Sequence, residues 1–225
     1  MTRTMFVGDV HGCLQEYDEL VARFAPSSND CIVHVGDLIA RGPESIGVIR
    51  RARDLGAIVI RGNHEERLLQ WRATPEQIKM HATHLEVARA LSAEEWEWLG
   101  QTPLWMDFPE HQVRVVHAGV DPTETEFLRQ TPFTLMNIRT VGTSSRSWAA
   151  EYDQEPHIVF GHHAAEGLQL HAHATGLDTG CVYGGQLTGL VLEHGQRPFE
   201  PARRQEQLLH AKAKRVYVPA RSQRT

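Results

Sequence analysis

The first 65 residues alternate short apolar runs with amphipathic segments in a regular order. The apolar runs cover 4–7, 31–35 and 57–60, whereas segments 14–25 and 43–56 place their apolar residues at helical spacing. Strands joined by helical connections of this length pair in parallel, with right-handed crossovers. The sequence therefore predicts an α/β fold that begins with a parallel βαβαβ unit.

The rest of the chain predicts helices and then more strands. Residues 75–100 have helical spacing. Four strand-like runs, punctuated by Gly and Pro, follow at 111–120, 156–163, 168–180 and 185–193. The last two are predicted to be neighbouring antiparallel strands, and the turn-rich stretch 121–156 an irregular layer near the site. We therefore expect a four-layer αββα sandwich, with two mixed sheets face to face and helices outside.

Polar residues follow each of the early strands. The first run is followed by Asp9 and His11, the second by Asp37 and the third by Asn63 and His64. Ligands bind at the carboxyl ends of strands in open α/β sheets. Because the three strands are predicted to be parallel, these side chains are expected to converge on one place.

Two later strand-like runs end in the same way, with His117 and His162. Alone, each of these residues is an ordinary turn or strand-end residue, but five such clusters in one chain predict a metal centre. Mixed imidazole, carboxylate and carbonyl ligands suit Mn, Fe, Zn or Co. Two ions about 3.5–4 Å apart can clamp a phosphoryl group and generate hydroxide at neutral pH.

Composition predicts a cytoplasmic globular protein. The three cysteines have no metal-ligand spacing, and no apolar run approaches the roughly 18 residues of a membrane span. We expect one domain over residues 1–200 and a basic tail over 201–225, where basic residues outnumber acids seven to one although the net charge of the chain is −5. The tail is either solvated or an electrostatic arm for nucleotides or RNA.

Five motifs together resemble the signature of the calcineurin-like metallophosphoesterases, in particular their phosphoprotein-phosphatase branch. They are GDVHG (8–12), GDLIARG (36–42), GNHE (62–65), HAG (117–119) and GH (161–162). The resemblance implies an αββα sandwich with a dinuclear centre. Its implied ligands are Asp9, His11 and Asp37 for one ion, and Asp37, Asn63, His117 and His162 for the other.

The same resemblance implies roles for further residues. His64 would be the general acid, Arg41 would grip phosphate, and Asn63 would contact the substrate as well as the metal. Arg139 falls where this branch places a second phosphate-binding arginine, although a plain surface arginine is the alternative. The implied cofactors are two divalent transition-metal ions, with Mn²⁺ as the first choice and Co²⁺, Fe or Zn²⁺ as alternatives.

A narrower resemblance connects two segments to the symmetrical bis(5′-nucleosyl)-tetraphosphatases (ApaH type). These segments are 36–43, in which Ala40 replaces the usual Asp, and 177–193. The chain departs from that group in two ways. Only 44 residues separate His117 from His162, where the group carries a larger insertion that covers the substrate, and GNHE stands where GNHD is common.

The missing acid at Ala40 is expected to affect the choice of substrate. In the protein phosphatases this acid orients and charges the histidine of GNH, which helps a basic serine alkoxide to leave. A nucleoside diphosphate leaves more readily, so the sequence favours a dinucleoside tetraphosphate, cleaved symmetrically (Ap4A and water to two ADP) by a metal-bridging hydroxide. Asp37, Arg41 and His64 would be the catalytic residues. A phosphoprotein (Ser/Thr/Tyr) phosphatase is the alternative, and capped RNA is a further substrate to test.

Overall fold

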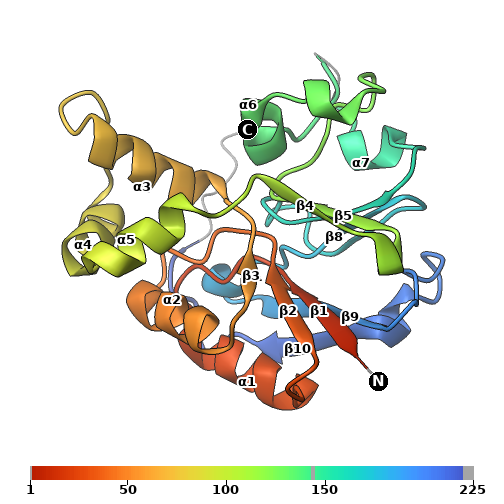
Figure 1. Ribbon diagram of the computed structural model, residues 1–225, viewed down its shortest axis with the longest axis horizontal. Helices are drawn as coiled ribbons and strands as arrows, with labels where there is room; N and C mark the ends of the chain where they lie inside the picture. Colours follow the sequence, from red (N-terminus) through yellow and green to blue (C-terminus); the bar gives the residue numbers. More distant parts are fainter. Residues whose placement is uncertain (1, 143–144, 220–225) are drawn as a thin grey trace.

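Two mixed five-stranded sheets pack face to face in the computed structural model, which describes residues 2–142 and 145–219 (Figure 1). The first sheet has the order β10–β9–β1–β2–β3, and the second β4–β5–β6–β8–β7. The strands of the first sheet are β1 (Arg3–Val7), β2 (Cys31–His34), β3 (Ile58–Val59), β9 (Gln186–Glu193) and β10 (Leu208–Lys212). Those of the second are β4 (Trp105–Phe108), β5 (Val113–Val116), β6 (His157–Phe160), β7 (Gln169–Leu170) and β8 (Ala174–Gly176).

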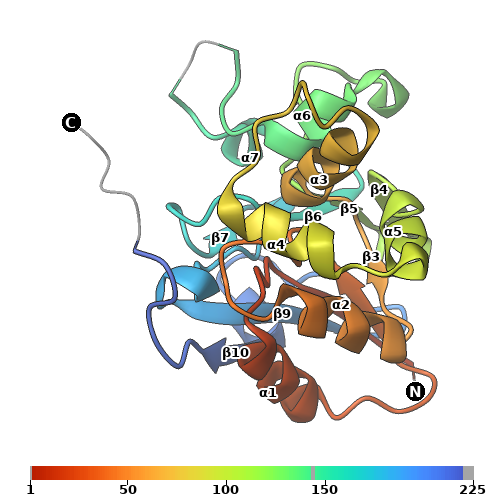
Figure 2. The ribbon, with the colours of Figure 1, turned by 90° about the vertical axis from the view of Figure 1, so that its left-hand side faces the viewer.

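Helices cover the outer faces and one end of the sandwich (Figures 1 and 2). The first sheet is covered by α1 (Leu14–Phe24) and α2 (Ser45–Asp54), and the second by the short α6 (Pro132–Asn137) and α7 (Trp148–Glu151). A separate group lies at one end and consists of α3 (Asn63–Ala73), α4 (Ala82–Ala90) and α5 (Ala93–Gly100). The predicted αββα sandwich is confirmed. Within the described residues, no helix has the length and apolar character needed to cross a bilayer.

The parallel βαβαβ unit is also confirmed, since β1 pairs in parallel with β2 and β2 with β3. Residues of β1 alternate between two apolar layers. Phe6 points between the sheets, where it meets the edge of Phe108 with a centroid distance of 5.2 Å, whereas Met5 and Val7 pack toward α1 and α2. Both faces of β1 are therefore buried, as expected of a central strand covered on two sides.

The expected antiparallel pairing of runs 168–180 and 185–193 is wrong. The first run supplies β7 and β8 of the second sheet, whereas the second run is β9, which pairs with β1 in the first sheet. The chain crosses between the sheets at 178–185, where Gly180 and Gly184 adopt positive φ values of 66° and 91°. Local apolar alternation identifies a strand but carries no information about which strand lies beside it.

Part of the segment after residue 200, for which composition left open a solvated tail or an electrostatic arm, packs against the rest of the fold. Residues 208–212 form β10, and Arg204 is 1% exposed, with its guanidinium donating to the carbonyl oxygens of His171 and Ala174. The Tyr217 hydroxyl donates to the Glu16 carboxylate at 2.8 Å. These partners lie far away in sequence, so the basic composition does not reveal them. Arg221 and Arg224 lie outside the described residues.

Buried neutral histidines predict that the fold loses stability in acid. Burial lowers the pKa of His157 to about 3, and its Nε2 lies 2.8 Å from the Thr175 hydroxyl. The unfolded chain takes up this proton near pH 6.5, so the free energy of unfolding should fall as pH decreases from about 6.5 to 3, by roughly 1.4 kcal/mol per pH unit. In urea unfolding of the metal-free protein, His157→Asn should remove the uptake of about one proton on unfolding and so lower this slope by roughly 1.4 kcal/mol per pH unit. The exposed His194→Asn is the control, and equal slopes in both variants would contradict the assignment.

Candidate metal centre

All six residues predicted as metal ligands lie together at the carboxyl ends of strands from both sheets. They are Asp9 and His11 after β1, Asp37 after β2, Asn63 at the start of α3, His117 after β5 and His162 after β6. Because β1 and β2 are parallel, as are β5 and β6, each sheet delivers its polar strand ends to one edge. The packing of the sheets then brings the two edges together.

Tight backbone turns place these donors. Positive φ values of 46°, 51° and 70° occur at His11, Asp37 and His162. This is the left-handed region of the backbone, which residues other than Gly adopt at an energetic cost. The turns also need glycine. A Cβ on Gly161 would lie 1.9 Å from Oδ1 of Asp9, and one on Gly62 would lie 2.3 Å from Oδ1 of Asp37. The motif glycines therefore allow backbone to approach the carboxylates.

Asp37 lies at the middle of the cluster. Its Oδ2 is 3.6 Å from Nε2 of His11 and 3.5 Å from Nε2 of His117. Two groups of donors, each within 4.8 Å, share this residue: His11, Asp37 and His64 form one, and Asp37, His117 and His162 the other. Asp37 is therefore the carboxylate that could serve both ions of the expected pair.

The hydrogen bonds of two histidines prepare them to bind metal. Nδ1 of His11 lies 3.0 Å from the Ile39 carbonyl oxygen, and Nδ1 of His117 lies 3.0 Å from that of Val35. A carbonyl accepts only from N–H, so both Nδ1 atoms carry a proton and both Nε2 atoms are turned toward Asp37. Nearby, Oδ1 of Asn63 lies 3.0 Å from Nε2 of His117. Imidazole nitrogens and an amide oxygen are ligands that a transition metal accepts.

The charges of the cluster also fit cations. Burial raises the pKa of Asp9, and the neighbouring carboxylates of Asp178 and Asp37 raise it further. Burial likewise raises the pKa of Asp178 to about 6. It lowers the pKa of His11 to about 3 and that of His162 to about 2. Buried carboxylates beside neutral imidazoles form an electron-rich site that divalent ions would stabilise.

Glu65 connects the turn after β2 to the start of α3, a role that the sequence reasoning did not identify. Its buried carboxylate accepts the N–H groups of Asp37 and Leu38 at 2.9 Å, that of Ile39 at 3.3 Å and that of Gly62 at 3.0 Å. The signal was present, because Glu65 is the third residue of a helix that begins after Gly62, as in a capping box. Glu65 thereby fixes the backbone that carries the central carboxylate.

His84 is the second residue that the sequence reasoning left out. Its Nε2 lies 3.0 Å from Nδ1 of His64, and the two rings are nearly parallel, with 8° between their planes. His84 is 4% exposed, and burial lowers the pKa of both rings to about 4. The hydrogen-bond partner of His64 is thus a neutral imidazole and not a carboxylate. His84 lies on α4, and no local pattern pairs it with His64.

The two predicted phosphate-binding arginines lie on different sides of the cluster. The Nε–H of the exposed Arg139 lies 3.3 Å from Nε2 of His162. Arg41 lies outside the two donor groups and contacts the hydroxyl of Tyr183, which belongs to the crossing between the sheets. Asn63 and His162 are half-buried, so the cluster is open to solvent on the Arg139 side.

Comparisons with known proteins agree with this geometry. A "Bis(5′-nucleosyl)-tetraphosphatase PrpE (asymmetrical)" of Halalkalibacterium halodurans is 33% identical over 215 residues, which cover 82% of this chain and 87% of the relative. A "Bis(5′-nucleosyl)-tetraphosphatase, symmetrical" of Shewanella baltica is 39% identical over 132 residues, or 56% of this chain and 47% of the relative. The second alignment thus spans about half of each protein.

A solved structure and a family model cover more of the fold. The "Crystal structure of a putative diadenosine tetraphosphatase" matches with a TM-score of 0.79 and 29% identity, over 94% of this chain and 93% of that one. The model of the calcineurin-like phosphoesterases matches residues 2–182, which include all six candidate ligands. The chain therefore belongs to the calcineurin-like phosphoesterase family.

Proposed function

We propose that this protein hydrolyses dinucleoside tetraphosphates at the central anhydride, giving two nucleoside diphosphates. The observation that carries the proposal is the partner of His64, which is the neutral imidazole of His84, with Ala40 in the turn after β2. The hydrogen-bond partner of His64 is not a carboxylate, and burial lowers the pKa of His64 to about 4, so at neutral pH it is a poor proton source for a strongly basic alkoxide. A nucleoside diphosphate spreads its charge over phosphate oxygens and needs less help to leave. The site therefore suits a phosphoanhydride better than a phosphoserine ester.

In this proposal, Asp9, His11 and Asp37 hold one ion, and Asp37, Asn63, His117 and His162 hold the other. Bound divalent ions would neutralise phosphate charge and supply a water-derived nucleophile at neutral pH. We propose Mn²⁺ as the native ion. The imidazole and carboxylate donors also accept Co²⁺, Fe or Zn²⁺.

The side chains around the cluster then have separate tasks. Arg41 and Arg139 approach from different sides and hold non-bridging phosphate oxygens through charge-assisted hydrogen bonds. His64, whose Nε2 lies 4.0 Å from Oδ2 of Asp37, faces the reacting centre and assists the departing diphosphate by donating a hydrogen bond to it. His84 holds the other side of this ring and so fixes its direction.

Cleavage at the centre is the more specific part of the proposal, because the relatives named above differ in this respect. Segment 177–193 supports it, since it resembles the symmetrical group and places Asp178 beside Asp9 and Tyr183 beside Arg41. Cleavage at the central anhydride and cleavage at an outer anhydride both break a phosphoanhydride bond, so the neutral partner of His64 fits either reaction. Product analysis distinguishes the two.

The test is chromatography of the products formed by the Mn²⁺-loaded protein from diadenosine tetraphosphate, with a phosphopeptide in parallel. We expect ADP as the sole nucleotide product and slow release of phosphate from the peptide. Formation of AMP and ATP would agree with the phosphohydrolase chemistry but would show that the central anhydride is not the bond cleaved. An untouched nucleotide would overturn the proposed substrate class.

A second candidate function is a phosphoprotein phosphatase. The open side of the cluster favours it, because Arg139 is exposed and a phosphorylated side chain could reach half-buried Asn63 and His162 from solvent. The neutral partner of His64 argues against serine and threonine esters and less strongly against phosphotyrosine, whose phenolate leaves more easily. Rapid dephosphorylation of the peptide in the parallel assay would establish this alternative.

The orienting role of His84 predicts an effect that depends on the leaving group. His84→Ala should lower kcat for phenyl phosphate by on the order of tenfold more than kcat for 2,4-dinitrophenyl phosphate, because only the more basic phenolate needs a well-placed proton. His81→Ala, an exposed histidine at the start of the same helix, is the control. Equal losses on both esters would mean that His84 supports only the fold.

A further inference from the structure

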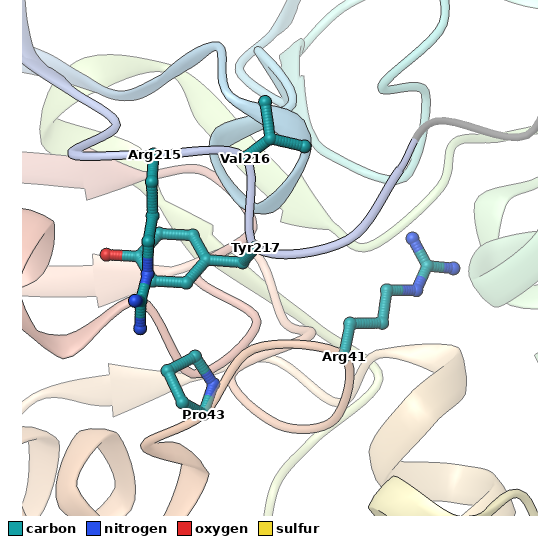
Figure 3. A pocket seen from close by; sticks show the side chains of 5 residues that line it. All are labelled: Arg41, Pro43, Arg215, Val216 and Tyr217. Atoms are coloured by element: carbon teal, nitrogen blue, oxygen red, sulfur yellow. The ribbon is translucent and has the colours of Figure 1, made fainter.

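A hollow of about 270 Å³ lies next to the candidate centre, outside its two groups of metal donors. Its lining residues are Arg41, Pro43, Arg215, Val216 and Tyr217. Figure 3 shows Arg215 and the Tyr217 ring on one side, Arg41 on the other and Pro43 near the base. Two segments far apart in sequence thus form one hollow, and Arg41 belongs both to it and to the phosphate-binding turn.

The hollow is cationic although the whole chain carries a net charge of −5. Within residues 2–142 and 145–219, neither Arg41 nor Arg215 has a carboxylate within 4.0 Å. Arg41 contacts the Tyr183 hydroxyl, and the Arg215 guanidinium lies 5.1 Å from the centre of the Tyr217 ring. Two guanidinium groups without a nearby carboxylate give the hollow a positive potential that suits an anionic ligand.

The walls of the hollow are held in place by distant parts of the fold. The hydroxyl of Tyr217 donates to the Glu16 carboxylate, and the backbone N–H of Tyr217 donates to the Val182 carbonyl oxygen at 3.1 Å. On the opposite wall, the N–H of Gly42 donates to the carbonyl oxygen of His11 at 2.9 Å, which ties the turn carrying Arg41 to a candidate metal ligand. The hollow is therefore pre-formed and adjoins the centre.

We infer that this hollow binds the nucleoside diphosphate that leaves the centre, with its phosphates on Arg41 and its base against the Arg215 and Tyr217 side chains. The inference rests on the proposed function and names the subsite for one half of that substrate. A volume of about 270 Å³ is near the lower limit of ligand pockets, and it suits one nucleoside rather than a whole dinucleotide. Guanidinium groups both bind phosphate and stack on planar rings. The C-terminal segment would thus supply contacts that a larger insertion provides in the symmetrical group.

The test is Arg215→Ala in the Mn²⁺-loaded full chain. We expect KM for diadenosine tetraphosphate and the inhibition constant of ADP each to rise about tenfold, the loss of one stacking contact between the guanidinium and the base. The KM for p-nitrophenyl phosphate and the inhibition constant of inorganic phosphate, which have no nucleoside, should rise far less. Arg203→Ala is the matched control, because Arg203 is an exposed basic residue of the same segment that pairs with Glu206 outside the hollow.

The outcomes separate the subsite from the proposed reaction. If Arg215→Ala weakened ADP and inorganic phosphate equally, or no more than Arg203→Ala does, the subsite would be wrong even if the tetraphosphate were a substrate. If the tetraphosphate were not hydrolysed but ADP inhibition still depended on Arg215, the proposed reaction would fail and the nucleotide subsite would stand. A phosphopeptide whose KM rose as much as that of the nucleotide would assign the hollow to peptides and overturn the inference.

Discussion

Asp37→Asn should reduce hydrolysis of diadenosine tetraphosphate by on the order of 10³-fold or more and lower the content of bound metal. Asp37 is the only residue shared by the donor groups around His11 and His117 within the described part of the chain, so its charge serves both proposed ions. Asn keeps the shape of the side chain and tolerates the positive φ of 51° at this position. The loss of activity should therefore come from the missing carboxylate charge that serves both proposed ions, with little change in the backbone.

The measurement pairs initial rates with metal content determined on the same Mn²⁺-loaded samples. Asp107→Asn is a suitable control, because it removes one carboxylate charge from an ion pair with Arg114 on β4 and β5, outside the cluster. Circular dichroism should show folded protein in both variants. Full activity and an unchanged content of bound metal in Asp37→Asn would contradict the two-ion proposal.

Glu65→Ala should lower the free energy of unfolding by about 3–5 kcal/mol, more than any other variant proposed for this protein. The substitution removes the acceptor of the buried N–H groups of Asp37, Leu38, Ile39 and Gly62. Each buried donor left without a partner costs roughly 1–3 kcal/mol, and partial relaxation of the turn reduces the sum. Typical domains have only 5–15 kcal/mol of stability, so the variant should be marginal.

Urea unfolding of the metal-free protein measures this effect without a contribution from metal binding. Glu66→Ala is the matched control, because the neighbouring carboxylate forms an ion pair with Arg61 that is partly exposed and should contribute about 1 kcal/mol or less. Where Glu65→Ala is too unstable to purify, Glu65→Gln keeps one acceptor oxygen and should lie between the two. A loss in Glu65→Gln no greater than in Glu66→Ala would show that the buried hydrogen bonds contribute little.

Much of the candidate centre followed from local patterns in the sequence. Asp9, Asp37 and His117 each follow a short apolar run, and the geometry of parallel strands delivers such residues to one edge of a sheet. The first three strands and two helices were predicted for the same reason, because a short apolar run and a following segment with apolar residues at helical spacing are both properties of neighbouring residues. Side-chain chemistry then limited the site to a metal centre.

Other features depend on segments that meet only when the chain is folded. His84 reaches His64 from another helix, β9 joins the first sheet although β8 lies in the second, and Arg204 is buried within a segment of basic composition. Each of these depends on which surfaces pack together, and many packings share the same local apolar pattern. The sequence therefore predicted the kinds of ligand and their common edge, whereas packing determined the neutral partner of the proposed acid and the cationic hollow beside it.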